Sequence, residues 1–348
     1  MFSLADWYCF VGFDYHDSFV QVCILDSKGS IIGNQQVENR VTAIVEYVDN
    51  LRDGRVIRGA AIETCCGASN LAEQLQDREW PIALAHAGIC EKMKRSPDKS
   101  DFADAHLLAD LCRVGYLPKV WLPPKAIRDI RRLTRFRQQL VDQRRDIKLR
   151  MRALLREERI EPSSDVGNVW TKSWFKWLKE TKSLSEHSRW VMDSHIADLD
   201  RVVKKIAETE ERMEAATKDD DVVQKLRSTK GVGLVTAVVM RAEIGDFNRF
   251  ASGKQLARYC AVTPKNASSG KRMADGGLVK AGSLVLRTML VEAAHRLARY
   301  QPHWKALKEQ LKQRGKPGSV AAAAVANRWI RKLFWEMRKV EVNEQIAA

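Results

Sequence analysis

The sequence lacks the features of a membrane protein, a disulfide-rich protein or a small cross-linked fold. No apolar run approaches the roughly 20 residues that span a bilayer, and charged residues make up 30% of the chain. The seven cysteines form an odd set without a Cys-x-x-Cys pair, which argues against a disulfide framework and a zinc site. The apolar N-terminus contains Asp6 and lacks the basic start of a signal peptide. We therefore expect a soluble cytoplasmic protein with reduced thiols and no membrane partner.

Charge is distributed unevenly along the 348 residues, which are enough for about two domains. Residues 1–120 carry 12 basic and 17 acidic side chains, whereas residues 121–348 carry 47 and 27. A local positive excess favours binding of a polyanion, because neutralised phosphates release their condensed counterions. Nucleic acid is therefore the leading candidate partner. A solvated basic surface without a specific ligand is the alternative.

The first 120 residues alternate strand and helix patterns. Apolar runs rich in β-branched and aromatic residues, turn residues and helical spacing predict, in order, strands at 7–13, 18–25 and 31–37, a helix at 41–51, a strand at 56–62, a helix near 71–76, a strand at 82–85 and a helix at about 102–113. This order is typical of an RNase H-like α/β domain. Another α/β sheet fold has the same order and remains an alternative.

Two long amphipathic helices are predicted after Pro123 and Pro124. Residues 125–159 contain 13 basic and 5 acidic side chains and no Gly or Pro. An apolar seam with a period close to seven runs along them, at Ile130, Leu133, Leu140, Ile147, Met151 and Leu154. A second stripe at about 185–216 suggests a coiled-coil hairpin or a dimerisation element. Three tryptophans between the helices have helical spacing, which favours packing over base stacking.

The remaining residues predict a compact helical domain. Gly231-Val232-Gly233 resembles the hairpin of a helix-hairpin-helix unit, whose glycines let backbone amides approach phosphate oxygens. A plain connector between helices is the alternative. A loop rich in Gly, Ser and Lys follows at 261–282. The predicted domains are therefore 1–120, 121–220 and 221–348.

Four acidic residues of the first domain fall where carboxylates could converge. Asp14 ends the first predicted strand, Glu63 ends the fourth, and Asp101 and Asp104 lie three residues apart on one helix face. Phosphoryl chemistry on nucleic acid uses such hard oxygen ligands to hold Mg²⁺. Taken singly, each acid is also compatible with an ordinary turn, core or helix-cap role. The seven histidines lack metal-ligand spacing, so we expect core or surface roles for them.

The motifs around these acids resemble those of the DEDD transposases of the insertion-sequence one-ten family, which includes pilin-gene invertases and bridge-RNA-guided recombinases. The N-terminal motifs are Gly12-Phe13-Asp14, Ile62-Glu63-Thr64 and Lys99-Ser100-Asp101-Phe102-Ala103-Asp104-Ala105. The C-terminal half resembles the family's transposase domain through Gly231-Val232-Gly233, Ala242-Glu243-Ile244-Gly245-Asp246-Phe247, Gln255-Leu256-Ala257, Thr263-Pro264, Ser268-Ser269-Gly270, Lys280-Ala281-Gly282 and Leu286-Arg287. The family's usual Ala-Thr-Gly is replaced by Thr64-Cys65-Cys66-Gly67.

The resemblance implies a fold and a reaction. The fold would be an RNase H-like (RuvC-like) N-terminal domain, a coiled-coil helical arm and a helical C-terminal transposase domain. The acids Asp14, Glu63, Asp101 and Asp104 would be catalytic and would bind Mg²⁺ or Mn²⁺. Ser269 would attack a DNA phosphate and form a covalent phosphoserine link, with Ser268 as the neighbouring alternative. The acids and the serine would act on one phosphodiester, across a subunit boundary if the chain is an oligomer.

The partners implied are donor and target DNA, a structured guide (bridge) RNA, and further copies of the chain in a homodimer or homotetramer. We expect the 130–154 seam to support the oligomer, and a nucleoid-associated location in a bacterial cytoplasm. The residues expected to contact nucleic acid are Lys99, Arg131, Arg135, Gly231, Gly233, Lys271, Arg272, Lys280 and Arg287. Two rival interpretations are a metal-dependent junction nuclease, in which water attacks, and a non-enzymatic nucleic-acid-binding scaffold.

Overall fold

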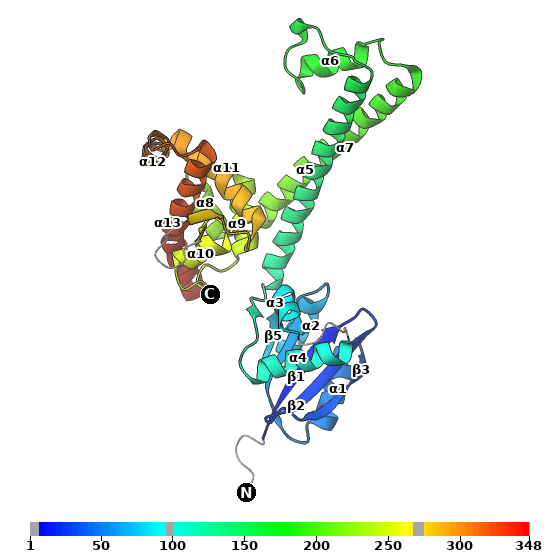
Figure 1. The fold of residues 1–348 in the computed structure, drawn as a ribbon, viewed down its shortest axis with the longest axis vertical. Coiled ribbons are helices and arrows are strands. Elements are labelled where there is room, and N and C mark those ends of the chain that lie inside the picture. Colours follow the sequence, from blue (N-terminus) through cyan, green and yellow to red (C-terminus); the bar gives the residue numbers. More distant parts are fainter. Residues whose placement is uncertain (1–6, 95–99, 267–274, 348) are drawn as a thin grey trace. The chain divides into compact units, whose positions relative to one another are not determined.

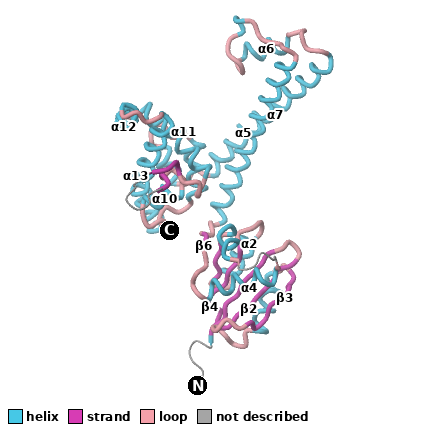
Figure 2. Tube along the Cα trace, viewed as in Figure 1, coloured by secondary structure: helices cyan, strands magenta, loops and turns pink. Residues whose placement is uncertain are grey.

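A computed structural model describes residues 7–94, 100–266 and 275–347. The chain divides into two compact units, residues 1–123 and 124–348, drawn in Figures 1 and 2. The first unit matches the predicted N-terminal domain closely. The second contains both the predicted arm and the predicted C-terminal domain, so the division between those two remains a prediction.

The first unit is a mixed sheet covered by helices. Its elements are β1 (Tyr8–Tyr15), β2 (Phe19–Asp26), β3 (Ile31–Glu38), α1 (Val41–Leu51), β4 (Val56–Glu63), α2 (Ala68–Gln76), β5 (Ile82–Ala85), α3 (Ala87–Met93), α4 (Asp101–Arg113) and β6 (Lys119–Val120). The strand order is β3-β2-β1-β4-β5-β6. Strand β4 is parallel to both β1 and β5, whereas the β1–β2, β2–β3 and β5–β6 pairs are antiparallel. The parallel strands therefore end at one edge of the sheet.

The two faces of this sheet are buried by different helices. Alternate residues of β1, such as Val11 and Phe13, pack with Ile44 of α1 and Leu75 of α2 in one core cluster. On the other face α4 covers the sheet, where its alanines pack on β2 and its leucines near β5. The approach is closest at Gly12, where a Cβ atom would lie 2.0 Å from the carbonyl oxygen of Ala105. A side chain at this strand position would displace α4.

The second unit begins with an antiparallel helical hairpin. Helix α5 (Lys125–Glu157) lies beside α7 (Glu186–Ala216), and η2 (Ser164–Val166) and α6 (Lys172–Glu180) lie between them in sequence (Figure 1). The apolar seam of α5 is buried against α7, for example Met151 and Leu140 with Ile196 and Leu199. The coiled-coil hairpin was predicted correctly. The expectation that this seam supports an oligomer stays a prediction, because a heptad pattern looks the same whether the partner helix belongs to the same chain or to another.

The rest of the second unit is a helical domain around one core. It consists of α8 (Asp221–Arg227), α9 (Leu234–Ile244), α10 (Gly253–Tyr259), the hairpin β7 (Pro264–Asn266) and β8 (Asp275–Leu278), α11 (Leu284–Tyr300), α12 (Pro302–Gln313) and α13 (Gly318–Ala347). Its core cluster includes Phe247, Leu290 and Phe334, and Ile130 of α5 also packs into it.

The prediction of a mixed α/β N-terminal part and a helical C-terminal part is confirmed. The short elements α3 and β6 were not predicted. Trp174 is fully buried among neighbouring aromatic rings, as helix packing required. All seven cysteines are free. Among the described residues, no helix is both long and apolar enough to cross a membrane.

Candidate active site

The acids of the first unit lie at the edge where parallel strands end. Phe13 of β1 pairs with Ile62 of β4, which places Asp14 and Glu63 side by side at the carboxyl ends of these strands. Helix α4 begins with Asp101 and carries Asp104 one turn later. Since the carboxyl ends of parallel strands are where α/β sheets form their sites, the topology brings the four acids to one edge of the sheet, and their role as a site remains a prediction.

Asp14 and Asp101 converge on His16, which follows β1. The His16 Nε2 atom lies 3.4 Å from Asp14 Oδ2 and 3.4 Å from Asp101 Oδ1. One ligand atom from each of the three residues lies within 4.8 Å of the other two. The imidazole stacks on Phe19 with a centroid distance of 4.5 Å, and its Nε2 is shielded from solvent. Two carboxylates and an imidazole are a donor set suited to a divalent cation.

The electrostatics of the site favour a bound cation. Burial raises the pKa of the Asp14 carboxyl, and the nearby Asp104 and Asp101 raise it further, against the opposing effect of His16. Burial also raises the pKa of Glu63, and Asp104 and Asp14 add to this while Lys94 opposes it. Several partly desolvated carboxylates therefore repel one another, and a positive charge placed among them would relieve the repulsion.

Lys94 supplies one such charge. Its ammonium nitrogen lies 2.9 Å from both carboxylate oxygens of the buried Asp104 and 3.1 Å from Glu91. Burial opposes protonation of Lys94, but the bonds to Asp104 and Glu91 outweigh it and raise the pKa of this lysine to about 12. The ammonium is therefore charged at neutral pH.

Sequence reasoning missed both His16 and Lys94. His16 stands two residues after Asp14, and in extended chain such residues share a face. This spacing could have identified it. Lys94 carried no such signal, because it reaches Asp104 only through the end of α3, an element that was not predicted.

Several predicted site residues lie outside the described residues. These are Lys99 in the first unit and Ser268, Ser269, Lys271 and Arg272 in the second. The hairpin of β7 and β8 flanks the segment that contains the two serines, with Asn266 paired to Asp275. The nucleophile therefore remains a prediction.

The predicted glycine hairpin connects α8 to α9. Gly231 has a φ of +106°, in the left-handed region, and Gly233 immediately precedes α9. Arg296 Nε donates to the Gly231 carbonyl at 3.1 Å, and its Nη2 donates to Thr236 at 3.0 Å. This arginine occupies one face of the hairpin, while Gly233 is exposed. The structure thus contains the predicted pair of helices around a glycine turn.

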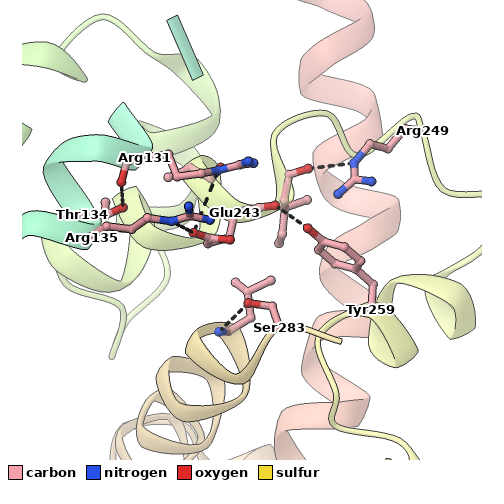
Figure 3. A network of polar contacts seen from close by, with 10 residues as sticks. Arg131, Thr134, Arg135, Glu243, Arg249, Tyr259 and Ser283 are labelled. Carbon is pink, nitrogen blue, oxygen red and sulfur yellow. Dashed lines mark hydrogen bonds and ion pairs between the residues drawn. The ribbon is translucent and has the colours of Figure 1, made fainter. Parts of the chain in front are cut away.

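Two predicted DNA-binding arginines are engaged within the protein. Arg131 Nε donates to the Ala242 carbonyl at 3.0 Å and lies 4.0 Å from the buried carboxylate of Glu243 (Figure 3). Arg287 Nε donates to the Ala261 carbonyl at 2.9 Å, and its Nη2 donates to the Val279 carbonyl. Both hold backbone segments together. Their assignment as nucleic-acid contacts remains a prediction.

The other two predicted basic contacts remain accessible. Arg135 is 62% exposed although its Nε lies 3.3 Å from Glu243, and Lys280 is exposed. Glu243 is thus shared by two arginines of α5, and its own carbonyl accepts from the Tyr259 hydroxyl at 2.9 Å (Figure 3). This network fixes the start of α5 on the helical domain.

Comparisons with known proteins cover both units. Residues 11–159 match a transposase family model for the DEDD domain of IS110, and residues 223–309 match the model described as "Transposase IS116/IS110/IS902 family". The chain is 25% identical over 290 residues to the transposase for insertion sequence element IS1111A of Coxiella burnetii, covering 83% of this chain and 78% of that protein. It is also 25% identical over 293 residues to a probable family 20 transposase of Pseudomonas aeruginosa, covering 80% and 82%.

A third relative is more similar over a shorter stretch. The putative transposase y4qE of Sinorhizobium fredii is 34% identical over 197 residues, which cover 56% of this chain and 47% of that protein. The two family models together match more than half of the chain, one on each side of the arm's second helix. The acids that converge at the sheet edge lie in the DEDD match, and the glycine hairpin lies in the other. The chain belongs to the IS110/IS116/IS902 family of insertion-sequence transposases.

Proposed function

We propose that this transposase exchanges DNA strands through a covalent phosphoserine intermediate, using a divalent cation held by Asp14, Glu63, Asp101 and Asp104. The observation that carries the proposal is that one ligand atom each of Asp14, His16 and Asp101 lies within 4.8 Å of the other two, beside Glu63 and Asp104. A solvated surface would not gather carboxylates whose pKa values are raised by burial and mutual repulsion.

The N-terminal unit would be an RNase H-like domain of the RuvC type. Three properties of its sheet support this assignment: the strand order β3-β2-β1-β4-β5, the antiparallel β2, and the parallel β4 and β5. The acids on β1, β4 and α4 then occupy the edge at which such a sheet builds its site. A divalent cation, Mg²⁺ or Mn²⁺, would polarise the phosphate and stabilise the charge that develops on it.

The residues of the chain have distinct roles in this proposal. Asp14 and Asp101 would hold the cation with His16 as a third donor, and Glu63 of β4 and Asp104 of α4 would complete the set. Lys94 holds Asp104 in place through its ammonium group. These residues orient the reacting phosphate and compensate its charge, and Ser269 supplies the nucleophile.

The covalent step is a transesterification at phosphorus, which requires neither an oxidant nor a co-reactant. The Ser269 hydroxyl loses its proton to solvent, its oxygen forms a bond to phosphorus, and the bond from phosphorus to one deoxyribose oxygen breaks. The released deoxyribose oxygen takes up a proton. In the exchange step a hydroxyl of another DNA strand attacks the phosphoserine, which restores a phosphodiester and releases the serine.

The proposal extends to partners of the chain. Donor and target DNA would bind through Arg135, Lys280, the Gly231–Gly233 hairpin and, in the segments outside the described residues, Lys99, Lys271 and Arg272. A structured guide RNA encoded by the element would select the sites, and a homodimer or homotetramer would bring two DNA partners together. The positive excess of residues 121–348 supports the nucleic-acid contacts.

A trapping experiment tests the chemistry. Full-length protein is incubated with labelled DNA carrying the ends of the element, its guide RNA and Mn²⁺, then denatured and resolved on a gel. We expect a covalent protein–DNA adduct that is lost in Ser269→Ala and in Asp101→Asn, and retained in Ser268→Ala. Strand cleavage by Ser269→Ala at the wild-type rate would instead assign the reaction to a nuclease that uses water.

A further inference from the structure

The exposed face of α13 combines an accessible tryptophan with three cations. Arg328, Arg331, Lys332 and Trp335 are all exposed, whereas Trp329, Leu333, Phe334 and Met337 on the opposite face are buried in the core. Trp335 is 60% exposed and makes an edge contact with Phe334 at a centroid distance of 5.0 Å. The helix is thus anchored by its buried face, and the side chains of the other face form a fixed row along it.

Two adjoining grooves run along this face. One, of about 570 Å³, is lined by Ser252, Gly253, Lys254, Arg328, Arg331, Lys332 and Trp335. The other, of about 550 Å³, lies between α13 and the β7–β8 hairpin, with an apolar floor and with Lys316, Arg328 and Arg331 at its side. Arg328 and Arg331 line both, so the two grooves form one track, which we call the α13 groove.

The α13 groove is positively charged. Lys254, Lys316, Arg328 and Arg331 form no ion pair within the part of the chain that the structure describes, and Lys332 is paired only loosely, 3.6 Å from Glu336. Gly253 brings α10 close to α13, since a Cβ there would lie 2.9 Å from the Arg331 carbonyl. This close packing sets Lys254 beside the row on α13. Cations without internal partners can bind external anions at little desolvation cost.

We propose that the α13 groove binds an unpaired segment of the DNA strand undergoing transfer. Aromatic side chains stack on bases only when the bases are unpaired, and single-strand sites combine such a ring with a row of cations that follows the backbone. The second groove is walled by β7 and β8, the strands that directly flank residues 267–274 with the predicted nucleophile. A strand in the groove therefore lies against the two strands between which the segment with Ser269 stands in the sequence, and for this reason we assign DNA rather than RNA.

This inference rests on the proposed function, but its test does not depend on chemistry. Full-length Ser269→Ala protein in EDTA is titrated with labelled single-stranded DNA, the matching duplex and single-stranded RNA of the same sequence. We expect Trp335→Ala in this background to weaken single-stranded DNA binding about tenfold, the effect of losing one stacked base, and to change duplex binding less than twofold. Trp335→Phe should restore most of the affinity. Arg331→Gln should lower the slope of log affinity against log salt by about 0.7.

A matched control is Trp190→Ala, which removes a tryptophan that is 72% exposed on α7. Its single-stranded DNA affinity should equal that of the parent protein. Unchanged binding in Trp335→Ala, or an equal loss in Trp190→Ala, overturns the proposal. Tighter binding of RNA than DNA that depends on Trp335 also overturns it in favour of an RNA groove. In each case the covalent adduct of the trapping experiment reports separately on the proposed function.

Discussion

The Lys94 ammonium lies 2.9 Å from each of the two carboxylate oxygens of Asp104, inside a cluster of acids that would hold a metal ion. Asp104 is therefore already compensated by a charge that belongs to the protein, whereas Asp14 and Asp101 share the imidazole of His16 as their common partner within the described residues. The site has one part built around a fixed cation and another suited to an exchangeable one.

Replacement of Lys94 by Met tests this division. The buried Asp104 carboxylate would lose its counter-charge, and we expect a loss of about 2 kcal/mol in the free energy of unfolding at pH 7 in EDTA. Mn²⁺ should stabilise the variant more than the wild type, because the ion replaces the missing charge. The measurement is the melting temperature with and without Mn²⁺. The control is Lys92→Met, which replaces an exposed lysine of α3, the helix that Lys94 directly follows. If Mn²⁺ raised the melting temperatures of Lys94→Met and the wild type equally, the division of the site into a part built around Lys94 and a part for an exchangeable ion would be contradicted.

Asp14→Asn should reveal the electrostatic repulsion between the carboxylates of the site. Burial and the acidic neighbours raise the pKa of Asp14. Protonated Asp14 therefore favours the folded state fully below the ordinary aspartate pKa, and this contribution to stability is lost as pH rises through the raised value. In EDTA the variant should therefore melt no lower than the wild type at pH 8, and any advantage should vanish towards pH 4. Mn²⁺ should raise the melting temperature of the wild type alone. Lower stability of the variant at pH 8 in EDTA would refute this account.

The sequence identified these acids because they stand at the ends of predicted strands, and alternation of apolar residues located the strands themselves within a few residues. It did not identify charge pairs between remote segments. Arg131 resembles the other arginines of a basic helix, yet its partner Glu243 lies on α9, and no local pattern connects the two. The α5 seam was found, but the sequence left open whether α7 or a second copy of the chain covers it, because a heptad repeat specifies a face and not the helix that covers it.

His16 should tune which metal the site prefers. An imidazole nitrogen favours borderline ions such as Co²⁺, whereas Mg²⁺ prefers oxygen donors. We expect His16→Gln to weaken Co²⁺ binding about tenfold or more while changing Mg²⁺ affinity little. Calorimetric titration of the full-length protein with each metal measures both constants. Equal effects on the two metals would show that His16 acts only through packing on Phe19.

Glu243→Gln should destabilise the attachment of α5 to the helical domain. Burial lowers the pKa of Arg131 and the Glu243 charge opposes this effect, so the variant leaves a buried guanidinium without its counter-charge. We expect a loss of about 3 kcal/mol in chemical denaturation. Glu210→Gln is the matched control: it removes the partner of Arg137, 2.7 Å away, and Glu210 is 34% exposed whereas Glu243 is 9% exposed, so we expect it to cost about 0.5 kcal/mol. Similar losses of unfolding free energy in the two variants would show that the Glu243 network stabilises the protein no more than an ordinary ion pair does.

Gly12→Ala should separate the acids without touching any of them. The new methyl group would lie 2.0 Å from the Ala105 carbonyl oxygen and 2.6 Å from the Ala109 amide nitrogen. Both are backbone atoms of α4, so the whole helix must shift, and Asp101 and Asp104 shift with it away from Asp14. We expect a loss of about 2 kcal/mol from overpacking and a Mn²⁺ affinity weakened about 10- to 100-fold, as when the support of a ligand is disturbed.

The control for this substitution is Gly88→Ala in the same unit. Gly88 is an exposed position of α3 where the nearest atom, on the His86 ring, would lie 3.6 Å from a new Cβ, an ordinary contact. Its Mn²⁺ affinity should match the wild type, and its stability should be equal to or slightly above that of the wild type, because alanine favours a helix over glycine. Because the two variants add the same methyl group, a difference between them isolates the distance between β1 and α4. Wild-type Mn²⁺ affinity in folded Gly12→Ala would mean that the ion does not require Asp14 and the α4 acids at their observed separation.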